Sequence, residues 1–574
     1  MMRLQAMRTF LVSAVALSAF GAFAATWTGK GFDDSWRDPN NWDGDVPGAA
    51  DTAVFDGTST RNCTIDVSWV KILTISENYT GTLTLANDFI VVDTYSQANG
   101  TFTCGDKNFT IGQGDGSSNQ SKRGFFTLSG GTFNCSSGIT QWKPTNNGPV
   151  FQIAETATWN HNNGEFVLGG PNNNAANFKA NVTFNNLRFT SRHRPRFAGG
   201  TTNHVLGTLT SHGVGFNSSS DSSTDVSKFA TLAVKGDLFF DNSDEITEKE
   251  ARWGGSGVIL LCGDEDQVIH CDGGHLPSLA ICKPADKKVT CDVPAGMRLA
   301  LCSDMGNGYG PHLSVQRGTF VFPDAGLSII SCRYANIAQK DGVLENTKGG
   351  FEMLGMRYNN YFSLKDKIGD LTFGGHVIRM SSDLMITGNV TIVSGGQFQI
   401  QDNGYTPILC GEGDQHYSCA HQSPASTSGS STYGAIKIDK PSGKLYLDSP
   451  LYAKFVTFVQ GAHIVFPITN ATSEVTAIGE GGWNSPAVIQ AERDISLPKD
   501  ERMCLEVTGK LNAESPTKWN VFKWGNKLSA NYAPENFDII LPPGCTRPKL
   551  KTDASQKLVY LSYHTPKGLM LLVR

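Results

Sequence analysis

The sequence predicts an all-β fold, a right-handed parallel β-helix (β-solenoid) with an N- and a C-terminal β cap. Within Gly257–Cys302, three apolar runs end in Cys262, Cys282 and Cys302, which are 20 residues apart. Cys271 and Cys291 are also 20 residues apart. A fixed period of about 20 residues indicates coils that each bury a face on the next. The runs are short, aliphatic and bounded by Gly, Asp or Pro, which favours strands over helices. These runs are Val258–Cys262, Leu279–Cys282 and Leu299–Cys302.

Composition agrees with a turn-rich β protein. The 574 residues include 62 glycines, and 18% are charged, against an average of about 25%. The net charge is −5 and no strongly basic face is evident in the sequence, so we expect no nucleic-acid partner. A solenoid core grows along one axis, so a chain of this length can form one continuous body.

The first 24 residues are typical of a secretory signal peptide. Met1–Arg8 carries two arginines, Thr9–Ala22 is apolar or small, and Ala22-Phe23-Ala24 forms an A-x-A cleavage site. An uncleaved anchor fits this layout less well. No later run approaches the ~20 apolar residues of a membrane span, so we expect no transmembrane segment after Ala25.

Residues 25–61 form a tryptophan-rich segment, in which Trp27, Trp36 and Trp42 lie within sixteen residues. Such an apolar load needs burial, and the open end of a solenoid offers a face to cover. We therefore predict an N-terminal cap. The alternative is a platform on which the three indole rings contact a glycan.

The pattern W-x-G…W…NW…P…D…F in this segment carries a resemblance. It is similar to the N-terminal segment of secreted β-helix surface proteins of Gram-negative bacteria, including those with autotransporter-associated β-strand repeats. The match covers Trp27–Phe55 only. The resemblance implies an exported β-helix, either extracellular or on the outer cell surface.

Residues 62–470 read as the solenoid, interrupted by polar loop insertions. The phrase Gly81-Thr-Leu-Thr-Leu recurs in kind as Gly100-Thr-Phe-Thr-Cys and Gly131-Thr-Phe-Asn-Cys. Each is a glycine turn that leads into a strand with alternating inward side chains. A longer repeat pairs Leu260–Cys271 with Ile408–Cys419 through Gly-x-x-Asp-Gln, and an apolar-x-apolar-x-Lys-Pro run follows both copies.

Residues 471–574 change character and contain Trp483, Trp519 and Trp524 but few repeat matches. The spacing of the last two tryptophans, Asn536-Phe537, Gly544 and Leu558–Leu561 resembles the end segment of autotransporter passenger solenoids. We predict a C-terminal β cap domain. No translocator barrel is expected after it, which departs from an autotransporter and leaves the route across the outer membrane open.

Thirteen cysteines in an exported chain suggest disulfides. The spacing C-x8-C predicts a staple within each coil. The alternative is a ladder of Cys262, Cys282 and Cys302, one coil apart at about 4.8 Å, whose thiols can be free because a free cysteine packs as a small hydrophobe. The predicted staple pairs are Cys262/Cys271, Cys282/Cys291 and Cys410/Cys419.

Metal sites have weak support, because no CxxC pair is present and disulfide formation competes for the thiols. Candidate zinc ligands are Cys410, His416, Cys419 and His421, with a looser echo in Cys262, His270, Cys271 and His275. Candidate calcium ligands are Asp43, Asp45, Asp51 and Asp115. We expect no metal and no cofactor.

No catalytic residue can be nominated, because stacked coils can bring carboxylates together anywhere. Asp264, Glu265 and Asp266 occupy the repeat turn, as do Glu412 and Asp414 in the other copy, which favours backbone capping over chemistry. We expect a structural or adhesive protein that binds glycans or neighbouring cells. The alternatives are a polysaccharide lyase or glycoside hydrolase on the same scaffold, and a self-assembling subunit of an extracellular layer or filament.

Overall fold

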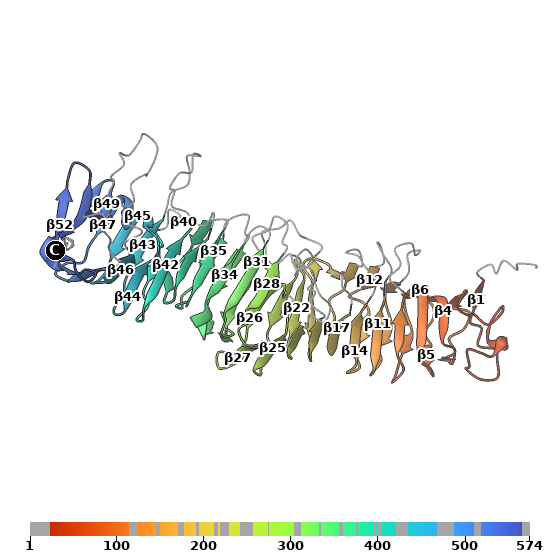
Figure 1. Ribbon diagram of the computed structural model, residues 1–574. Coiled ribbons are helices and arrows are strands. Elements are labelled where there is room, and N and C mark those ends of the chain that lie inside the picture. Colours follow the sequence, from red (N-terminus) through yellow and green to blue (C-terminus); the bar gives the residue numbers. More distant parts are fainter. Residues whose placement is uncertain are drawn as a thin grey trace, which may run out of the picture.

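The computed structural model shows an elongated body built from short strands stacked along one axis (Figure 1). It describes residues 23–113, 124–144, 150–169, 177–190, 195–211, 216–218, 229–240, 256–273, 275–303, 312–331, 335–354, 360–374, 377–393, 397–399, 404–420, 434–467, 487–509 and 518–564. These residues contain no α-helix, and hence none that could cross a bilayer. The predicted signal peptide lies outside them, except for Phe23 and Ala24 at the start of the first strand.

The largest sheet contains two series of parallel strands that share β6. The first series is β1 (Ala24–Thr26), β2 (Thr52–Phe55), β4 (Trp69–Ile75), β6 (Phe89–Gln97), β9 (Phe125–Leu128), β12 (Val150–Ile153), β15 (Asn177–Lys179), β18 (Arg196–Phe197) and β21 (Asn217–Ser218). The second continues from β6 through β8 (Phe109–Ile111), β11 (Ile139–Trp142), β14 (Glu165–Leu168), β17 (Asn186–Phe189), β20 (Leu209–Ser211), β23 (Leu238–Phe240), β25 (Gln267–Cys271), β27 (Lys288–Asp292), β30 (Thr319–Val321) and β33 (Val343–Glu345).

Two further sheets are also wholly parallel. The five-stranded sheet contains β3 (Cys63–Ile65), β5 (Thr82–Leu85), β7 (Thr101–Thr103), β10 (Thr132–Asn134) and β13 (Thr158–Asn160). A ten-stranded sheet contains β16 (Thr183–Phe184), β19 (Thr202–Val205), β22 (Thr231–Val234), β24 (Val258–Leu261), β26 (Ser278–Cys282), β29 (Leu313–Arg317), β32 (Ala335–Gln339), β35 (Asn360–Ser363), β37 (Val377–Met380) and β40 (Gln397–Gln399).

The C-terminal half adds two more sheets. One contains β28 (Leu299–Ser303), β31 (Leu327–Ser331), β34 (Phe351–Met353), β36 (Leu371–Phe373), β39 (Val390–Ile392), β42 (Gln415–Cys419), β44 (Lys444–Leu447), β46 (His463–Pro467), β48 (Met503–Thr508) and β51 (Phe537–Ile540). The other contains β38 (Leu384–Ile386), β41 (Pro407–Leu409), β43 (Ala435–Ile438), β45 (Leu451–Phe458), β47 (Ile489–Ser496), β49 (Lys518–Trp524), β50 (Lys527–Leu528), β52 (Thr546–Asp553) and β53 (Leu558–His564). Short 3-10 turns occur at Pro39–Asn41, Thr347–Gly349 and Pro534–Asn536.

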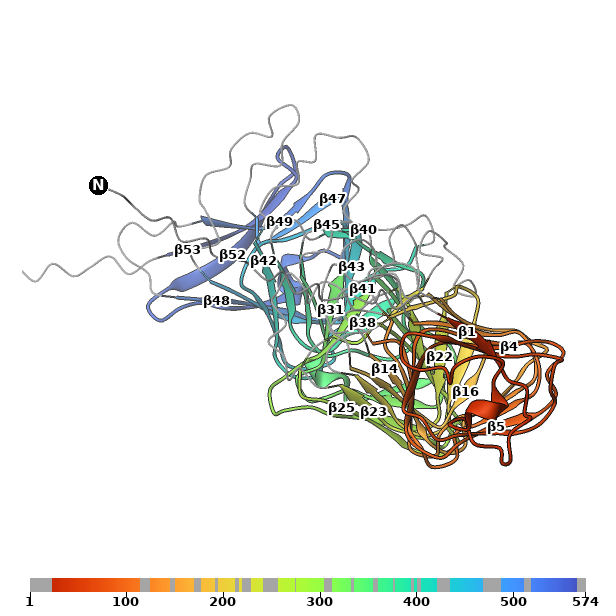
Figure 2. The same ribbon diagram turned by 90° about the vertical axis from the view of Figure 1, so that its right-hand side faces the viewer.

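The parallel β-helix prediction is confirmed. Successive strands such as β26, β27 and β28 belong to three different sheets, so one coil contributes one strand to each of three sides. Figure 2, turned by 90°, shows the N-terminal coils at the lower right and the later coils displaced step by step toward the C-terminal strands at the upper left. The core fills the interior because alternate side chains of each strand point inward, as in the buried–intermediate pattern of Thr52–Phe55.

Aromatic rings stack along the axis in the N-terminal half of the core. Phe102, Phe133 and Trp159 follow one another in three neighbouring coils, with ring centroids 5.3 and 5.2 Å apart and nearly parallel planes. Phe126 and Phe151 form a second column with centroids 4.2 Å apart. In-register strands force identical inward positions to stack, and offset aromatic pairs add stability beyond their buried area.

The tryptophan-rich segment folds back onto the first coils. Trp27 and Trp36 are fully buried and Trp42 is 5% exposed, and all three rings pack around Phe55. A ring with no exposed face cannot stack on a sugar, so the structure contradicts the glycan-platform alternative. The rings serve instead as core side chains.

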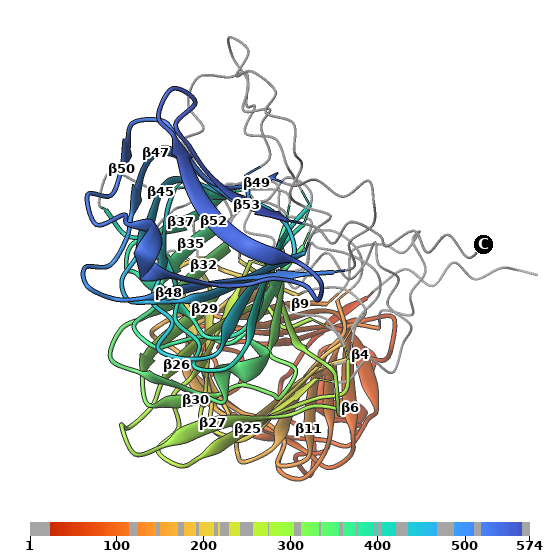
Figure 3. The ribbon, with the colours of Figure 1, turned by 60° about the vertical axis from the view of Figure 1, so that its left-hand side comes forward.

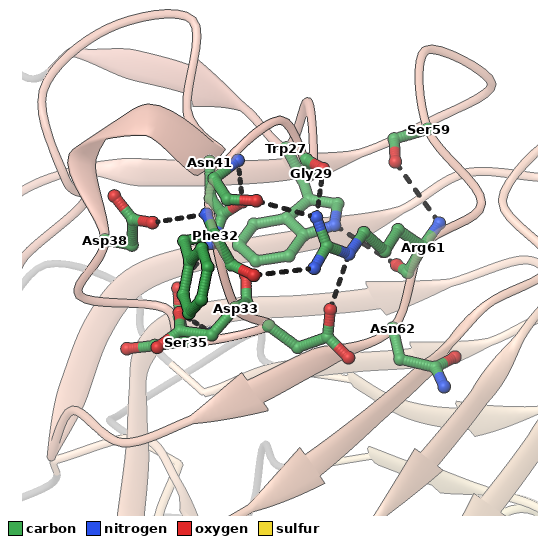
Figure 4. A network of polar contacts seen from close by, with 12 residues as sticks. Trp27, Gly29, Phe32, Asp33, Ser35, Asp38, Asn41, Ser59, Arg61 and Asn62 are labelled. Carbon is green, nitrogen blue, oxygen red and sulfur yellow. Dashed lines mark hydrogen bonds and ion pairs between the residues drawn. The ribbon is translucent and has the colours of Figure 1, made fainter.

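Arg61 holds this segment in place through its guanidinium group (Figure 4). Its Nε donates to Asp34 Oδ1 at 2.6 Å, and one terminal nitrogen donates to the carbonyl oxygens of Gly29 and Gly31, each at 2.8 Å. The Trp27 indole N–H returns a hydrogen bond to the Arg61 carbonyl oxygen at 3.1 Å. One side chain from the first coils therefore satisfies three groups of an otherwise irregular loop.

At the C-terminal end the pairing changes direction. Parallel pairing continues past residue 470 through β47, β48 and β51, although the sequence repeats fade there. β53 then runs antiparallel to both β49 and β52. Figure 3 shows β52 and β53 lying across the end of the stack. Backbone hydrogen bonds extend the coils independently of any side-chain repeat.

Candidate functional site

A groove crosses four successive strands of the largest sheet, β20, β23, β25 and β27, and encloses about 690 Å³. We call it the lateral groove. Its lining combines an aromatic ring, an imidazole, two carboxylates and threonine side chains. The lining residues are Thr208, Thr210, Phe239, Phe240, His270, Cys271, Asp272, Asp292, Val293 and Pro294.

Strand register builds the central row of the lateral groove. Thr210 pairs with Phe239, Phe239 with His270, and His270 with Asp292. Alternation along each strand sends the neighbouring residues Leu238 and Phe240 into the core, so the row itself faces outward. Four side chains thus lie in line at the strand spacing of about 4.8 Å, although they come from widely separated parts of the sequence.

The row is held by specific contacts. The His270 ring stacks on Phe239 with centroids 4.5 Å apart and planes 9° from parallel. His270 Nδ1 lies 2.9 Å from Asp292 Oδ2. Because a carboxylate accepts, this contact keeps the proton on Nδ1 and leaves Nε2 of the neutral ring as an acceptor. Phe239 remains 37% exposed, so an aromatic surface lies beside hydrogen-bonding groups.

A buried polar unit at the start of β25 fixes the turn between β24 and β25. The Gln267 side chain donates to the Val234 carbonyl oxygen at 3.2 Å and also to that of Gly236. The Lys283 ammonium, fully buried, donates to Gly263 O at 2.8 Å and to Gln267 Oε1 at 2.5 Å. Burial lowers the pKa of Lys283. The bonds to Gly236 and Gly263 satisfy carbonyl groups that lack a backbone donor among the described residues, whereas Val234 O also accepts from Cys262 N.

The second copy of the repeat builds the same unit. Gln415 Nε2 donates to the carbonyl oxygens of Ile386 at 3.1 Å and Gly388 at 2.5 Å. Lys440, 1% exposed, donates to those of Gly411 and Gly413, each at 2.7 Å. The Gly-x-x-Asp-Gln and Lys-Pro elements of the repeat are thus two halves of one structural device.

The acidic residues of the repeat turn act as backbone acceptors. Asp266 Oδ1 accepts from Lys288 N at 2.8 Å, and Asp414 Oδ1 accepts from Lys444 N at 2.9 Å. Glu265 pairs with the Lys287 ammonium at 3.0 Å. Their partners are thus backbone amides and a surface lysine of the next coil.

A second histidine cluster occurs on a different sheet. The His416 ring stacks on Tyr446 with centroids 4.5 Å apart and planes 7° from parallel. Its Nδ1 lies 2.9 Å from Asp448 Oδ2. This cluster contains the same three kinds of group as the lateral groove, but Tyr446 and Asp448 both come from the coil after His416, so they do not form a row across three strands.

No disulfide joins any of the twelve cysteines in the described part of the chain. The thirteenth, Cys332, lies outside the described residues. The predicted staples are absent because the two cysteines of a C-x8-C pair fall on different sides of the coil. Cys282 belongs to β26 and its predicted partner Cys291 to β27, in separate sheets. Likewise Cys410 follows β41, whereas Cys419 lies in β42.

The ladder alternative is correct for one step only. Cys262 and Cys282 directly follow the paired residues Leu261 and Ile281, so they are neighbours in adjacent coils. Cys302 lies in β28, in another sheet. The register between β25 and β27 places Cys291 opposite Ile269 rather than opposite Cys271.

The metal alternatives gain no support from the described residues, in which no three His, Cys, Asp or Glu side chains converge on one point. Asp43 Oδ1 accepts from Thr26 N at 2.6 Å, and Asp51 Oδ2 accepts from Gly48 N at 3.0 Å, so these carboxylates support backbone turns. His421 and Asp115 lie outside the described residues.

Comparison with known proteins adds nothing to this geometry: no family model, curated protein or solved structure matches the chain significantly. The site therefore rests on the structure alone. Sequence reasoning found His270, Cys271 and the repeat turn but missed Phe239 and Asp292. The stretch of chain from Phe239 to His270 is longer than that from His270 to Asp292, so no single period in the sequence brings the three together.

Proposed function

We propose that this chain is an exported β-helix protein with a structural or adhesive role outside the cell, and that it binds a glycan chain in the lateral groove. The observation that carries the proposal is the row Phe239–His270–Asp292 within an open hollow of about 690 Å³. Binding sites combine an apolar surface with a few placed polar groups.

Glycan binding fits the groups present. A sugar ring has an apolar face, which the exposed surface of Phe239 can cover, and hydroxyl groups, which His270 and Asp292 can bind. The groove runs across strands rather than along one, so it can accommodate an extended chain of several sugars. Preformed coils position these groups on a regular backbone, which reduces the ordering cost of binding.

The test is retention of the purified chain from residue 25 on neutral, acidic and sulfated polysaccharides. We expect Phe239→Ala to weaken binding to the retained polymer by at least tenfold, equivalent to about 1.4 kcal/mol. Val343→Ala is the matched control, because Val343 is 46% exposed on β33 of the same sheet but outside the groove. Equal binding by the two variants would refute the proposal for this groove.

A polysaccharide lyase or hydrolase is the second candidate, favoured by the His270–Asp292 contact. A histidine oriented by a carboxylate is an arrangement suited to proton transfer, and Asp272 supplies a further carboxylate in the groove. New reducing ends or unsaturated products, abolished in His270→Ala, would assign this activity. Retention without cleavage would assign binding alone.

The resemblance of Trp27–Phe55 to bacterial surface β-helix proteins supports the extracellular part of the proposal, as does the signal-peptide pattern of residues 1–24. Expression of the full chain in a Gram-negative host, followed by fractionation and N-terminal sequencing, tests export. We expect a mature chain that begins at Ala25. Retention of the unprocessed chain in the cytoplasm would refute this part.

A further inference from the structure

The recurring motif Gly-Thr-x-Thr contributes no residue to the lateral groove. It lies on a different sheet of the solenoid. Its threonines lie on the five-stranded sheet formed by β3, β5, β7, β10 and β13. We call the outward surface of this sheet the threonine face. Register aligns its side chains in two columns. They are Thr82, Thr101, Thr132 and Thr158, and Thr64, Thr84, Thr103, Asn134 and Asn160.

The two columns form a two-dimensional lattice of polar groups. Neighbouring strands repeat every ~4.8 Å, and residues i and i+2 along a strand lie about 6.6 Å apart. The phenylalanines between the threonines, Phe102 and Phe133, are fully buried and stack with planes 4° from parallel. This stacked core holds the strands above it in register, so the outer lattice is fixed from beneath.

The chemistry of the threonine face is uniform. Seven of the nine positions are threonine and two are asparagine, so none carries a charge or an aromatic ring. The branch at Cβ restricts χ1 of threonine, which limits the directions in which the methyl and hydroxyl groups of each column can point. At the end of the second column, Asn160 donates to Asn134 at 2.7 Å and Asn134 donates to Thr103 Oγ1 at 3.1 Å, which fixes these amides as well.

Several threonine hydroxyl groups of this face are available to bind a ligand outside the protein. Among the described residues, Thr84, Thr101 and Thr132 make no side-chain hydrogen bond, whereas threonines at turns elsewhere use theirs. Thr156 Oγ1 donates to Ser129 O at 2.9 Å and Thr387 Oγ1 to Ile368 O at 2.9 Å. An array of such hydroxyl and methyl groups on strands in register orders the water above it at the spacing of the array.

We propose that the threonine face binds ice. Its two repeat distances both lie close to repeat distances of the oxygen lattice in ice, so water ordered over the columns can merge with a growing crystal. The competing ligand, a crystalline polysaccharide, would favour exposed aromatic rings for stacking on sugars, and this face has none. The inference is independent of the lateral groove, which lies on a different sheet.

The test measures thermal hysteresis and inhibition of ice recrystallisation by the purified chain from residue 25. We expect both activities in the unmodified protein and their loss in the double variant Thr101→Lys/Thr103→Lys, whose long charged side chains break the lattice. Thr127→Lys is the matched control, because Thr127 faces outward on β9 in a neighbouring sheet. We expect it to retain full activity, and circular dichroism should show that both variants are folded.

Three outcomes would overturn the inference. One is an unmodified protein without either activity, and another is equal loss in the control variant. The third is retention on microcrystalline cellulose or chitin that the double variant loses, without any effect on ice, which would assign the face to a polysaccharide surface. Polysaccharide binding that depends on Phe239 but not on Thr101 would support the lateral groove and leave the ice assay to decide this face.

Discussion

Trp36 offers the sharpest test of the buried role of the N-terminal tryptophans. Its ring is fully buried, with centroids 4.8 Å from Trp42, 5.8 Å from Phe55 and 6.0 Å from Phe89. Its indole N–H donates to the carbonyl oxygen of Pro47 at 3.0 Å. Trp36→Ala therefore opens a large cavity in the first coils and leaves a buried carbonyl group without its donor.

The expected cost follows from these two losses. Truncation of a buried tryptophan costs about 3–5 kcal/mol, and an orphaned buried acceptor adds about 1–3 kcal/mol. We expect the first coils to lose about 4–8 kcal/mol of stability in Trp36→Ala. Trp36→Phe keeps most of the ring and loses mainly the hydrogen bond, so its cost should be about 1–3 kcal/mol.

The assay must be local, because each coil of a solenoid contacts only its neighbours. Amide hydrogen exchange followed by mass spectrometry reports the free energy of opening at β2 and β4 separately from distant strands. Trp69→Ala is the control, since Trp69 is 46% exposed on β4, and surface substitutions usually change stability by about 0.5 kcal/mol or less. Equal loss of protection in Trp36→Ala and Trp69→Ala would refute the reasoning.

Three further predictions concern the repeat unit and the buried thiols. Lys283→Ala should lower the free energy of unfolding by about 2–4 kcal/mol in urea denaturation, because the buried Gly263 carbonyl oxygen loses its side-chain donor and Gln267 Oε1 keeps only the Gly263 N–H. Gly263→Ala should cost about 1–3 kcal/mol in the same assay, since a Cβ there would clash with the Lys235 carbonyl oxygen of the preceding coil. Stability should fall as pH rises above about 9, because burial raises the pKa of Cys104 and Cys135, so that only the unfolded chain ionises them.

Matched variants decide these three predictions. Lys287→Ala removes a half-buried surface lysine paired with Glu265 and should not change the midpoint of unfolding. An equal shift in both lysine variants would contradict the role of Lys283. Gly413→Ala should be tolerated, because its Cβ meets nothing within 4 Å. The alkaline loss of stability should shrink in Cys104→Val/Cys135→Val; an unchanged pH profile would show that other groups cause it.

The sequence alone determined the architecture. Short apolar runs at a fixed period, bounded by Gly and Pro, predicted strands stacked in coils, because only a repeated unit that buries its face on its neighbour needs that pattern. The recurrence of Gly-x-x-Asp-Gln marked the turn that Gln267 and Lys283 stabilise. The sequence also predicted that Trp27, Trp36 and Trp42 are buried, and in the structure they are.

Only the tertiary structure decided which residues meet. The offsets between paired strands are unequal, as the pairs Val258↔Ser278, Gln267↔Val289 and Leu238↔Ile269 show, because loops of different length join the strands. A small change in the offset between two strands moves every side chain to a different row. Cys262 and Cys282 have the same separation in the sequence as Cys271 and Cys291. The first two are neighbours in adjacent coils, but Cys291 lies opposite Ile269. The row Phe239–His270–Asp292 arises from these unequal offsets, which are set by strand register and loop length rather than by any local pattern.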